Sequence, residues 1–353
     1  KGYQLDKFSG NTQWKVSLDV RLTAGVAIDE QHVYVGARDG SVIALSKQNG
    51  SEVWREKLKS EPISAPSVHN EHLVIQLSNG QVFNLNTADG AVRWNFDGNV
   101  PALTIRGTGQ AVFFGEFVAV GLANGKLAIL DQTTGQLRWE NKVGIAQGDT
   151  EIERIVDVDT RPSLLLDKLF AVSYQGRVVA YDLQNGRTIW AEDESSYKEL
   201  TTGFGNVYVT SDNGMINAYD QGSGEVKWVN EDLLRRKLTS PTPVSSYLVV
   251  ADYDGYLHVI SQVDGQMVAR SRVDVLSRKC FCRNNRMTNV WRLVNESSGV
   301  RSAILADGNR FYAVANNGKL KAYEIGESID NAGSIVTSAR HWHKTSIKKR
   351  SSK

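Results

Sequence analysis

The chain has 353 residues, 41% of them hydrophobic, and its 41 basic and 39 acidic side chains leave a net charge of +2. This balance excludes the general positive field that a nucleic-acid-binding protein uses. No apolar run approaches the roughly 20 residues of a membrane-spanning helix. The only two cysteines, Cys280 and Cys282, exclude a disulfide scaffold and leave the cellular compartment open.

A spacing of glycine, nine residues, glycine, three residues and tryptophan recurs along the chain. It occurs at Gly40, Gly50 and Trp54; Gly80, Gly90 and Trp94; Gly125, Gly135 and Trp139; Gly176, Gly186 and Trp190; and Gly214, Gly224 and Trp228. From Trp14 to Trp228, consecutive tryptophans are 38 to 51 residues apart. A period near 40 residues with strand-like content is typical of the blade of a β-propeller.

Each unit predicts four antiparallel strands. Alternating apolar residues such as "HVYVGAR" predict a strand, and the Asn-Gly or Asp-Gly pair that follows predicts a tight hairpin. The recurring Asp131, Asp182 and Asp220 are expected to accept backbone N–H groups at the second turn. The tryptophan falls on the outermost strand, where it should cover the seam with the next blade and direct its N–H to a neighbouring carbonyl.

The pattern is incomplete at both ends of the chain. A sixth copy has Ala269 in place of tryptophan, a seventh begins at Gly318, and "LDKFSGNTQW" supplies only the final half of a unit, ending at Trp14. We expect one propeller domain over residues 1–325, with a non-repeating insertion at about 276–298. A basic, disordered tail is expected over 326–353. Either the ring has eight blades, of which the first is incomplete here, or seven blades close with "NTQWKVSL" as the outer strand of the last.

The run "AYDLQNGRTIW" resembles the blade motif of the pyrroloquinoline-quinone enzymes and their eight-bladed relatives. Within that superfamily the chain is similar to the BamB family of outer-membrane-protein assembly lipoproteins. The resemblance also covers loops outside the repeat, namely "PALTIRG", "GDTEIERIVDVDTRP", "DLLRRKLTSP" and "DYDGYLHVI". The segment 278–298, the tail and the incomplete first blade depart from the family pattern. The lipid-bearing cysteine that the family implies would lie upstream of Lys1.

Two stretched steps of the repeat mark the candidate site. Their extra residues fall in "NVPALTIRGTGQ" and "VGIAQGDTEIERIVDVDTRP", which should leave neighbouring blades on the same face. Together they offer Leu103, Ile105 and Arg106 beside Asp157 and Asp159, a composition typical of a protein-binding hot spot. The alternative is that the apolar pair packs the loop down, while the aspartates cap turns or pair with Arg106.

The family resemblance favours the binding interpretation. It implies that these five residues hold BamA through its periplasmic POTRA domains, with Asp157 and Asp159 either touching the partner or orienting Arg106. It further implies a protein in the bacterial periplasm, anchored to the inner leaflet of the outer membrane by an N-terminal lipid. Two mechanisms stay open: positioning the POTRA domains, or offering strand edges to unfolded outer-membrane proteins.

An enzyme is the competing class, because pyrroloquinoline-quinone dehydrogenases share the blade motif. Those enzymes have a pair of adjacent cysteines and long insertions around the quinone, which this chain lacks, so we expect neither an enzyme nor a cofactor.

The spacing of "CFC" and "HWH" does not match zinc sites, so no metal is expected. His69 and His72 are interpreted as a solvated turn. The basic, aromatic insertion is interpreted as a surface loop, and no nucleic-acid partner is expected.

Overall fold

The computed structural model describes residues 2–99, 109–144, 150, 156–158, 160–273, 299–329 and 335–339. In this part of the chain all regular structure is β, in one two-stranded sheet and seven four-stranded sheets. Within the same residues there is no helix with the length and apolarity needed to cross a membrane. By its contacts the chain divides into two compact units, residues 1–212 with 217–227, and residues 213–216 with 228–353.

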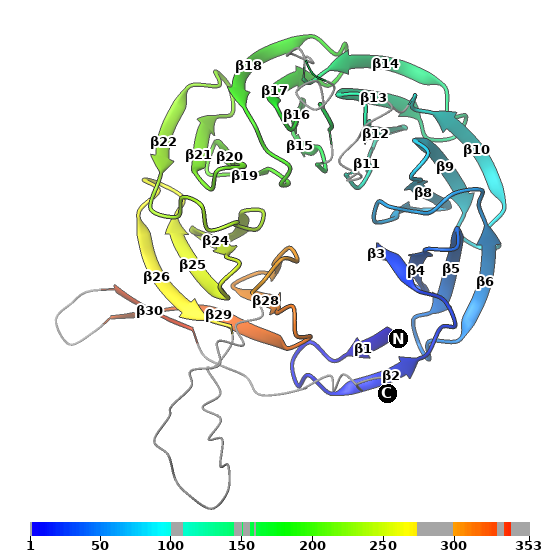
Figure 1. The fold of residues 1–353 in the computed structure, drawn as a ribbon, viewed down its shortest axis with the longest axis horizontal. Coiled ribbons are helices and arrows are strands. Elements are labelled where there is room, and N and C mark those ends of the chain that lie inside the picture. The colour runs from blue at the N-terminus through cyan, green and yellow to red at the C-terminus, as the bar shows by residue number, and fades with distance from the viewer. Residues whose placement is uncertain are drawn as a thin grey trace, which may run out of the picture. The chain divides into compact units, whose positions relative to one another are not determined.

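The first unit contains the two-stranded sheet and four complete four-stranded sheets (Figure 1). The two-stranded sheet pairs β1 (Gly2–Leu5) with β2 (Thr12–Val16). The next two sheets follow chain order: β3 (Leu22–Ile28), β4 (His32–Ala37), β5 (Ser41–Ser46) and β6 (Glu52–Lys57); then β7 (Ser67–His69), β8 (His72–Gln76), β9 (Gln81–Asn86) and β10 (Val92–Asp97).

The remaining sheets of this unit repeat the same meander. They consist of β11 (Val112–Phe114), β12 (Phe117–Gly121), β13 (Lys126–Asp131) and β14 (Leu137–Lys142); and of β15 (Ser163–Leu165), β16 (Lys168–Val172), β17 (Gly176–Asp182) and β18 (Thr188–Glu194). The boundary between the two units falls within the next sheet, β19 (Thr201–Gly203), β20 (Asn206–Thr210), β21 (Ile216–Asp220) and β22 (Val226–Asn230).

The second unit continues with two more sheets of four strands. They are β23 (Thr242–Val244), β24 (Tyr247–Ala251), β25 (Tyr256–Ser261) and β26 (Met267–Arg272); and β27 (Leu305–Asp307), β28 (Arg310–Val314), β29 (Leu320–Ile329) and β30 (Ile335–Ala339). Because β29 and β30 pair beyond Ile325, the last sheet extends past the predicted end of the propeller domain. The last sheet has its own fourth strand, and β2 pairs with β1.

The tryptophan motif forms the predicted seams between consecutive sheets. Five indole N–H groups donate to a main-chain carbonyl of the next sheet: Trp14 to Lys47 at 2.9 Å, Trp54 to Thr87 at 2.8 Å, Trp94 to Gln132 at 2.9 Å, Trp190 to Gln221 at 3.2 Å and Trp228 to Gln262 at 3.1 Å. The second glycine of the next unit lies against the ring. A β-carbon on Gly90 would lie 2.6 Å from Trp54, so only glycine fits there.

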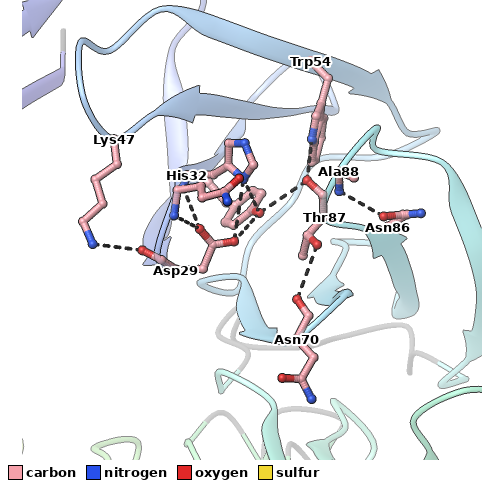
Figure 2. A network of polar contacts seen from close by, with 10 residues as sticks. Asp29, His32, Lys47, Trp54, Asn70, Asn86, Thr87 and Ala88 are labelled. Atoms are coloured by element: carbon pink, nitrogen blue, oxygen red, sulfur yellow. Dashed lines mark hydrogen bonds and ion pairs between the residues drawn. The ribbon is translucent and has the colours of Figure 1, made fainter.

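The seam covered by Trp54 is closed by further polar contacts (Figure 2). The Tyr34 hydroxyl donates to Asp29 Oδ2 at 2.6 Å and lies 3.4 Å from the Thr87 carbonyl that also accepts the Trp54 N–H. Burial pushes the pKa of Asp29 up, but hydrogen bonds from the Tyr34 hydroxyl and from backbone N–H groups outweigh it and lower that pKa. The Trp54 ring, the Thr87 carbonyl and the Asp29 carboxylate therefore close this seam together.

Two smaller predictions have opposite outcomes. The aspartates behave as expected, because Asp131 Oδ1 accepts the backbone N–H groups of Thr133 and Thr134 at 2.9 and 2.7 Å, and Asp182 and Asp220 make the same turn.

The solvated interpretation of His72 is wrong. His72 is 8% exposed and its Nδ1 lies 2.8 Å from Asn84 Nδ2, because it begins β8 facing the next strand rather than the turn.

Replacement of the motif tryptophan by Ala269 leaves a space in the second unit. A cavity of about 190 Å³ lies beside Ala269 and is lined also by Leu257, Val259, Phe311 and Tyr323. The missing ring is therefore not replaced by a neighbouring side chain, although Phe311 and Tyr323 stack with their ring centres 5.0 Å apart.

Candidate functional site

The predicted partner-binding residues lie on the two stretched segments between β10 and β11 and between β14 and β15. Leu103, Ile105, Arg106 and Asp159 lie outside the described residues. Asp157 is described, together with the points at which both segments leave and rejoin the sheets.

The first segment is attached at both ends to neighbouring turns. At its start the Gly98 N–H donates to the Gly80 carbonyl at 3.2 Å, and the Asn124 amide donates to the Gly98 carbonyl at 3.0 Å. At its end the Gln110 amide donates to the Pro66 carbonyl at 2.7 Å. Hydrogen bonds to main-chain carbonyls thus fix both described ends of the segment.

The second segment packs across the turn that joins β12 and β13. The Val158 N–H donates to the Leu122 carbonyl at 3.3 Å, and Val156 and Val158 are 6% and 0% exposed. Glycine makes this close approach possible. A β-carbon on Gly121 would lie 2.4 Å from the Val158 carbonyl oxygen, and one on Gly125 would lie 2.9 Å from the Val156 side chain.

The two segments meet where they rejoin the sheets. A β-carbon on Gly109 would lie 2.1 Å from the Thr160 carbonyl oxygen, so the end of the first segment lies directly against the end of the second. Asn124 holds the first segment and Leu122 holds the second, so one turn anchors both. For the described residues, this agrees with the prediction that the loops leave neighbouring blades on the same face.

Asp157 lies beneath the surface at this junction. It is 1% exposed, and its main-chain carbonyl accepts the Tyr174 N–H at 3.1 Å. Val156 and Val158 on either side pack against Gly125 and Gly121. A buried carboxylate is suited to orienting a neighbouring side chain, which is one of the two roles predicted for Asp157.

An aromatic pair beside Asp157 was not predicted from the sequence. Tyr174, whose N–H binds the Asp157 carbonyl, meets Tyr197 edge-on with ring centres 6.3 Å apart, and Tyr197 is 39% exposed. The Lys198 ammonium lies 4.6 Å from the Tyr197 ring centre, and burial lowers the pKa of Lys198. The connection after Trp190, "SSYKEL", is short and follows the regular spacing of the repeat, so no sequence signal marked this pair.

Metal ligands are not gathered in the part of the chain that the structure describes. Among those residues no group of three or more His, Cys, Asp or Glu side chains is placed to hold a metal ion. Cys280, Cys282, His341 and His343 lie outside the described residues.

Comparison with known proteins gives close matches to one family. A family model described as outer membrane protein assembly factor BamB matches residues 3–230. The BamB of Pseudomonas aeruginosa is 38% identical over 229 residues, covering 65% of this chain and 54% of that protein. The BamB of Kangiella koreensis is 45% identical over 266 residues, covering 75% and 69%. The chain therefore spans between about half and two thirds of the length of these relatives.

Solved structures give the same fold. The crystal structure of BamB from Moraxella catarrhalis matches with a TM-score of 0.79 and 27% identity, covering 89% of this chain and 88% of that one. A quinohemoprotein alcohol dehydrogenase from Comamonas testosteroni matches with a TM-score of 0.68 but only 15% identity, covering 90% of this chain and 68% of that one. The dehydrogenase shares the fold alone, and the prediction of a β-propeller with four-stranded antiparallel blades is confirmed.

Proposed function

Because the chain belongs to the BamB family of outer membrane protein assembly factors, we propose that it assists the assembly of β-barrel proteins into the bacterial outer membrane. It acts as a scaffold that binds other components of the assembly machinery. The prediction that the chain is not an enzyme is confirmed by this family, whose members are named as assembly factors, whereas the quinoprotein dehydrogenases are related only through the fold.

The proposed partner is BamA, bound through its POTRA domains by Leu103, Ile105, Arg106, Asp157 and Asp159. The observation that supports this site is the shared anchor of the two loops: the turn from Leu122 to Gly125 holds the bases of both segments. Two loops fixed to one rigid turn present their side chains as a single surface, which is what a hot spot requires. The buried Asp157 then positions Arg106, and the apolar pair supplies the contact area.

The place of action follows from the same family. We propose that the protein works in the periplasm at the inner leaflet of the outer membrane, held there by an N-terminal lipid. Bound to BamA, it either positions the POTRA domains or offers strand edges to unfolded outer-membrane proteins.

The test is binding of the POTRA segment of BamA to purified variants. Arg106→Ala and Leu103→Glu should each weaken binding by about 30-fold or more, the loss expected of a hot-spot residue at about 2 kcal/mol, while the thermal transition stays nearly unchanged. Arg187→Ala is the matched control, because Arg187 is an exposed arginine at the opposite end of its sheet. A large fall in thermal stability with binding retained would contradict the proposal.

Asp157→Asn separates the two roles of the aspartate. A positioning residue loses its effect when its target is removed, so Asp157→Asn should weaken binding in the natural chain but not further in the Arg106→Ala background. Independent losses that add would show instead that Asp157 contacts the partner itself.

A further inference from the structure

The seam between the last two sheets of the second unit lacks its motif tryptophan and contains a cavity instead. This cavity has a volume of about 190 Å³ and lies beside Ala269, and we call it the Ala269 cavity. Its apolar walls come from both sheets: Leu257, Val259 and Ala269 from the first, and Phe311, Tyr323 and Ile325 from the second. The two sheets share one apolar core, so the cavity lies within the seam.

At the other seams of the described chain a tryptophan ring takes this place. Each ring lies against the turn glycine of the next unit: Trp14 against Gly50, Trp54 against Gly90, Trp94 against Gly135, Trp139 against Gly186, Trp190 against Gly224 and Trp228 against Gly265. Ala269 has the same position in its sheet, because it pairs with Val259 as Trp54 pairs with Ala44. A methyl group therefore stands where the other seams have an indole.

The last sheet keeps a ring that contacts the indole at other seams. Tyr323 lies five residues after the first glycine of its unit, as Tyr181 and Tyr219 do in theirs. The ring centres of Tyr181 and Tyr219 lie 5.9 and 6.3 Å from those of the motif residues Trp139 and Trp190. Tyr323 lines the cavity instead. The surface that receives an indole is therefore present, and only the indole is missing.

Phe311 takes part of the vacated space without closing it. It stacks on Tyr323 with the ring centres 5.0 Å apart and an interplanar angle of 11°. The two residues are 2% and 1% exposed, so close packing holds both rings in place as one flat aromatic wall. One side of the seam differs from the others, because β29 runs on to Ile329 through the place where the other units turn at a glycine. The cavity is the space that remains beside this wall.

The size of the cavity sets the class of molecule that it can hold. At about 190 Å³ it is smaller than the usual ligand sites of about 300–1,000 Å³, which leaves no room for a peptide main chain. It is larger than an apolar cavity of about 150 Å³ that binds benzene. Arg270 and Glu324 also line it and are exposed or partly exposed, so the cavity reaches the surface and a molecule can enter.

We propose that the Ala269 cavity binds a free, flat aromatic molecule of the size of indole. The molecule lies between Ala269 and the stacked rings of Phe311 and Tyr323, where the motif side chain lies at the other seams. Contact with the aromatic wall and removal of its apolar surface from water stabilise the bound molecule. The residues that line the cavity are not those proposed to bind BamA, so either proposal can fail without the other.

The experiment uses the full chain and 5-fluoroindole, observed by ¹⁹F NMR. We expect saturable binding that Ala269→Trp weakens about tenfold or more, because the restored side chain fills the cavity. Val268→Trp is the matched control. It adds the same side chain to the same strand, but Val268 is 43% exposed and does not line the cavity, so this variant should bind the probe normally.

Thermal unfolding gives a second measurement of the same site. Because a ligand that binds only the folded state stabilises it, the probe should raise the melting temperature of the natural chain and of Val268→Trp, but not of Ala269→Trp. If Ala269→Trp does not fold, Ala269→Leu, which fills the cavity in part, takes its place and should weaken binding about threefold or more.

Three outcomes would overturn the proposal. The first is the absence of saturable binding to the natural chain. The second is equal binding by the natural chain and the variant at Ala269, which would place the probe elsewhere on the molecule. The third is binding of N-acetyltryptophanamide as tight as that of the probe, which would assign the cavity to a tryptophan side chain of a polypeptide rather than to a free molecule.

Discussion

The seam at Trp54 and the seam at Trp139 contain the same motif but end in different states. Trp54 is 9% exposed and its N–H is bonded to Thr87, with Tyr34 and Asp29 completing the contact (Figure 2). Trp139 also lies against the glycine of the next unit, Gly186, yet it stays half-buried beside a pocket. The motif fixes where the ring lies. The motif does not by itself fix whether the indole N–H finds an acceptor in the next sheet.

Removing the two tryptophans should give the largest difference between these seams. Trp54→Ala deletes a buried ring and leaves the Thr87 carbonyl short of a donor, so we expect a loss of about 3–5 kcal/mol in the free energy of unfolding. Trp139→Ala deletes a half-buried ring that donates no hydrogen bond to any residue the structure describes, and should cost about 2 kcal/mol. Guanidinium unfolding followed by circular dichroism measures both, and equal losses would mean that the Trp139 seam is as closed as the other.

The glycine behind the ring gives the next largest effect. Gly90→Ala places a β-carbon 2.6 Å from the Trp54 ring at a φ of 78°, and we expect it to cost about 2–4 kcal/mol by adding a clash to an unfavourable backbone. Gly205→Ala has nearly the same φ, 76°, but meets no atom within 4 Å, and should cost about 1 kcal/mol. The same unfolding measurement compares them. If the two losses match, the backbone conformation alone explains the glycine and the ring contact does not.

Local spacing was enough to predict the repeated parts of the molecule. The interval from the second glycine to the tryptophan places that ring on the outer strand in every unit that has one, and Asp131 caps its own turn through neighbours two and three residues away. Such features depend on residues close in sequence. The family of the chain was likewise readable, because loops outside the repeat resemble those of the family.

Features that depend on distant residues were not predictable in the same way. Trp139 carries the same motif as the other rings, yet within the described residues its N–H donates no hydrogen bond, which the spacing alone does not show. His72 looked solvated because its sequence neighbours are polar, and only the pairing of β8 with β9 shows that it faces Asn84. The strand from Ile335 to Ala339 has no motif, and pairing with β29 defines it. The roles of Leu103, Ile105, Arg106 and Asp159 stay predictions.

The smallest effect separates the two seams by their response to acid. Tyr34→Phe removes the hydroxyl that helps to lower the pKa of Asp29, and at neutral pH it should cost about 1 kcal/mol. A carboxylate with a lowered pKa stabilises the folded state above its ordinary pKa of about 3.9, and that contribution is lost as the pH falls through the lowered value. The cost of Tyr34→Phe should therefore shrink between pH 5 and about pH 3.

The tyrosine at the Trp139 seam provides the control for this pH dependence. Tyr181 donates its hydroxyl to the Lys142 carbonyl at 2.8 Å, and burial raises the pKa of Tyr181 to about 12, so neither partner titrates in acid. Tyr181→Phe should then cost about 1 kcal/mol at pH 7 and the same at pH 3. Free energies of unfolding of both variants and the natural chain across this range decide the matter. If the cost of Tyr34→Phe stays as constant as that of Tyr181→Phe, the carboxylate of Asp29 does not contribute to closing the Trp54 seam.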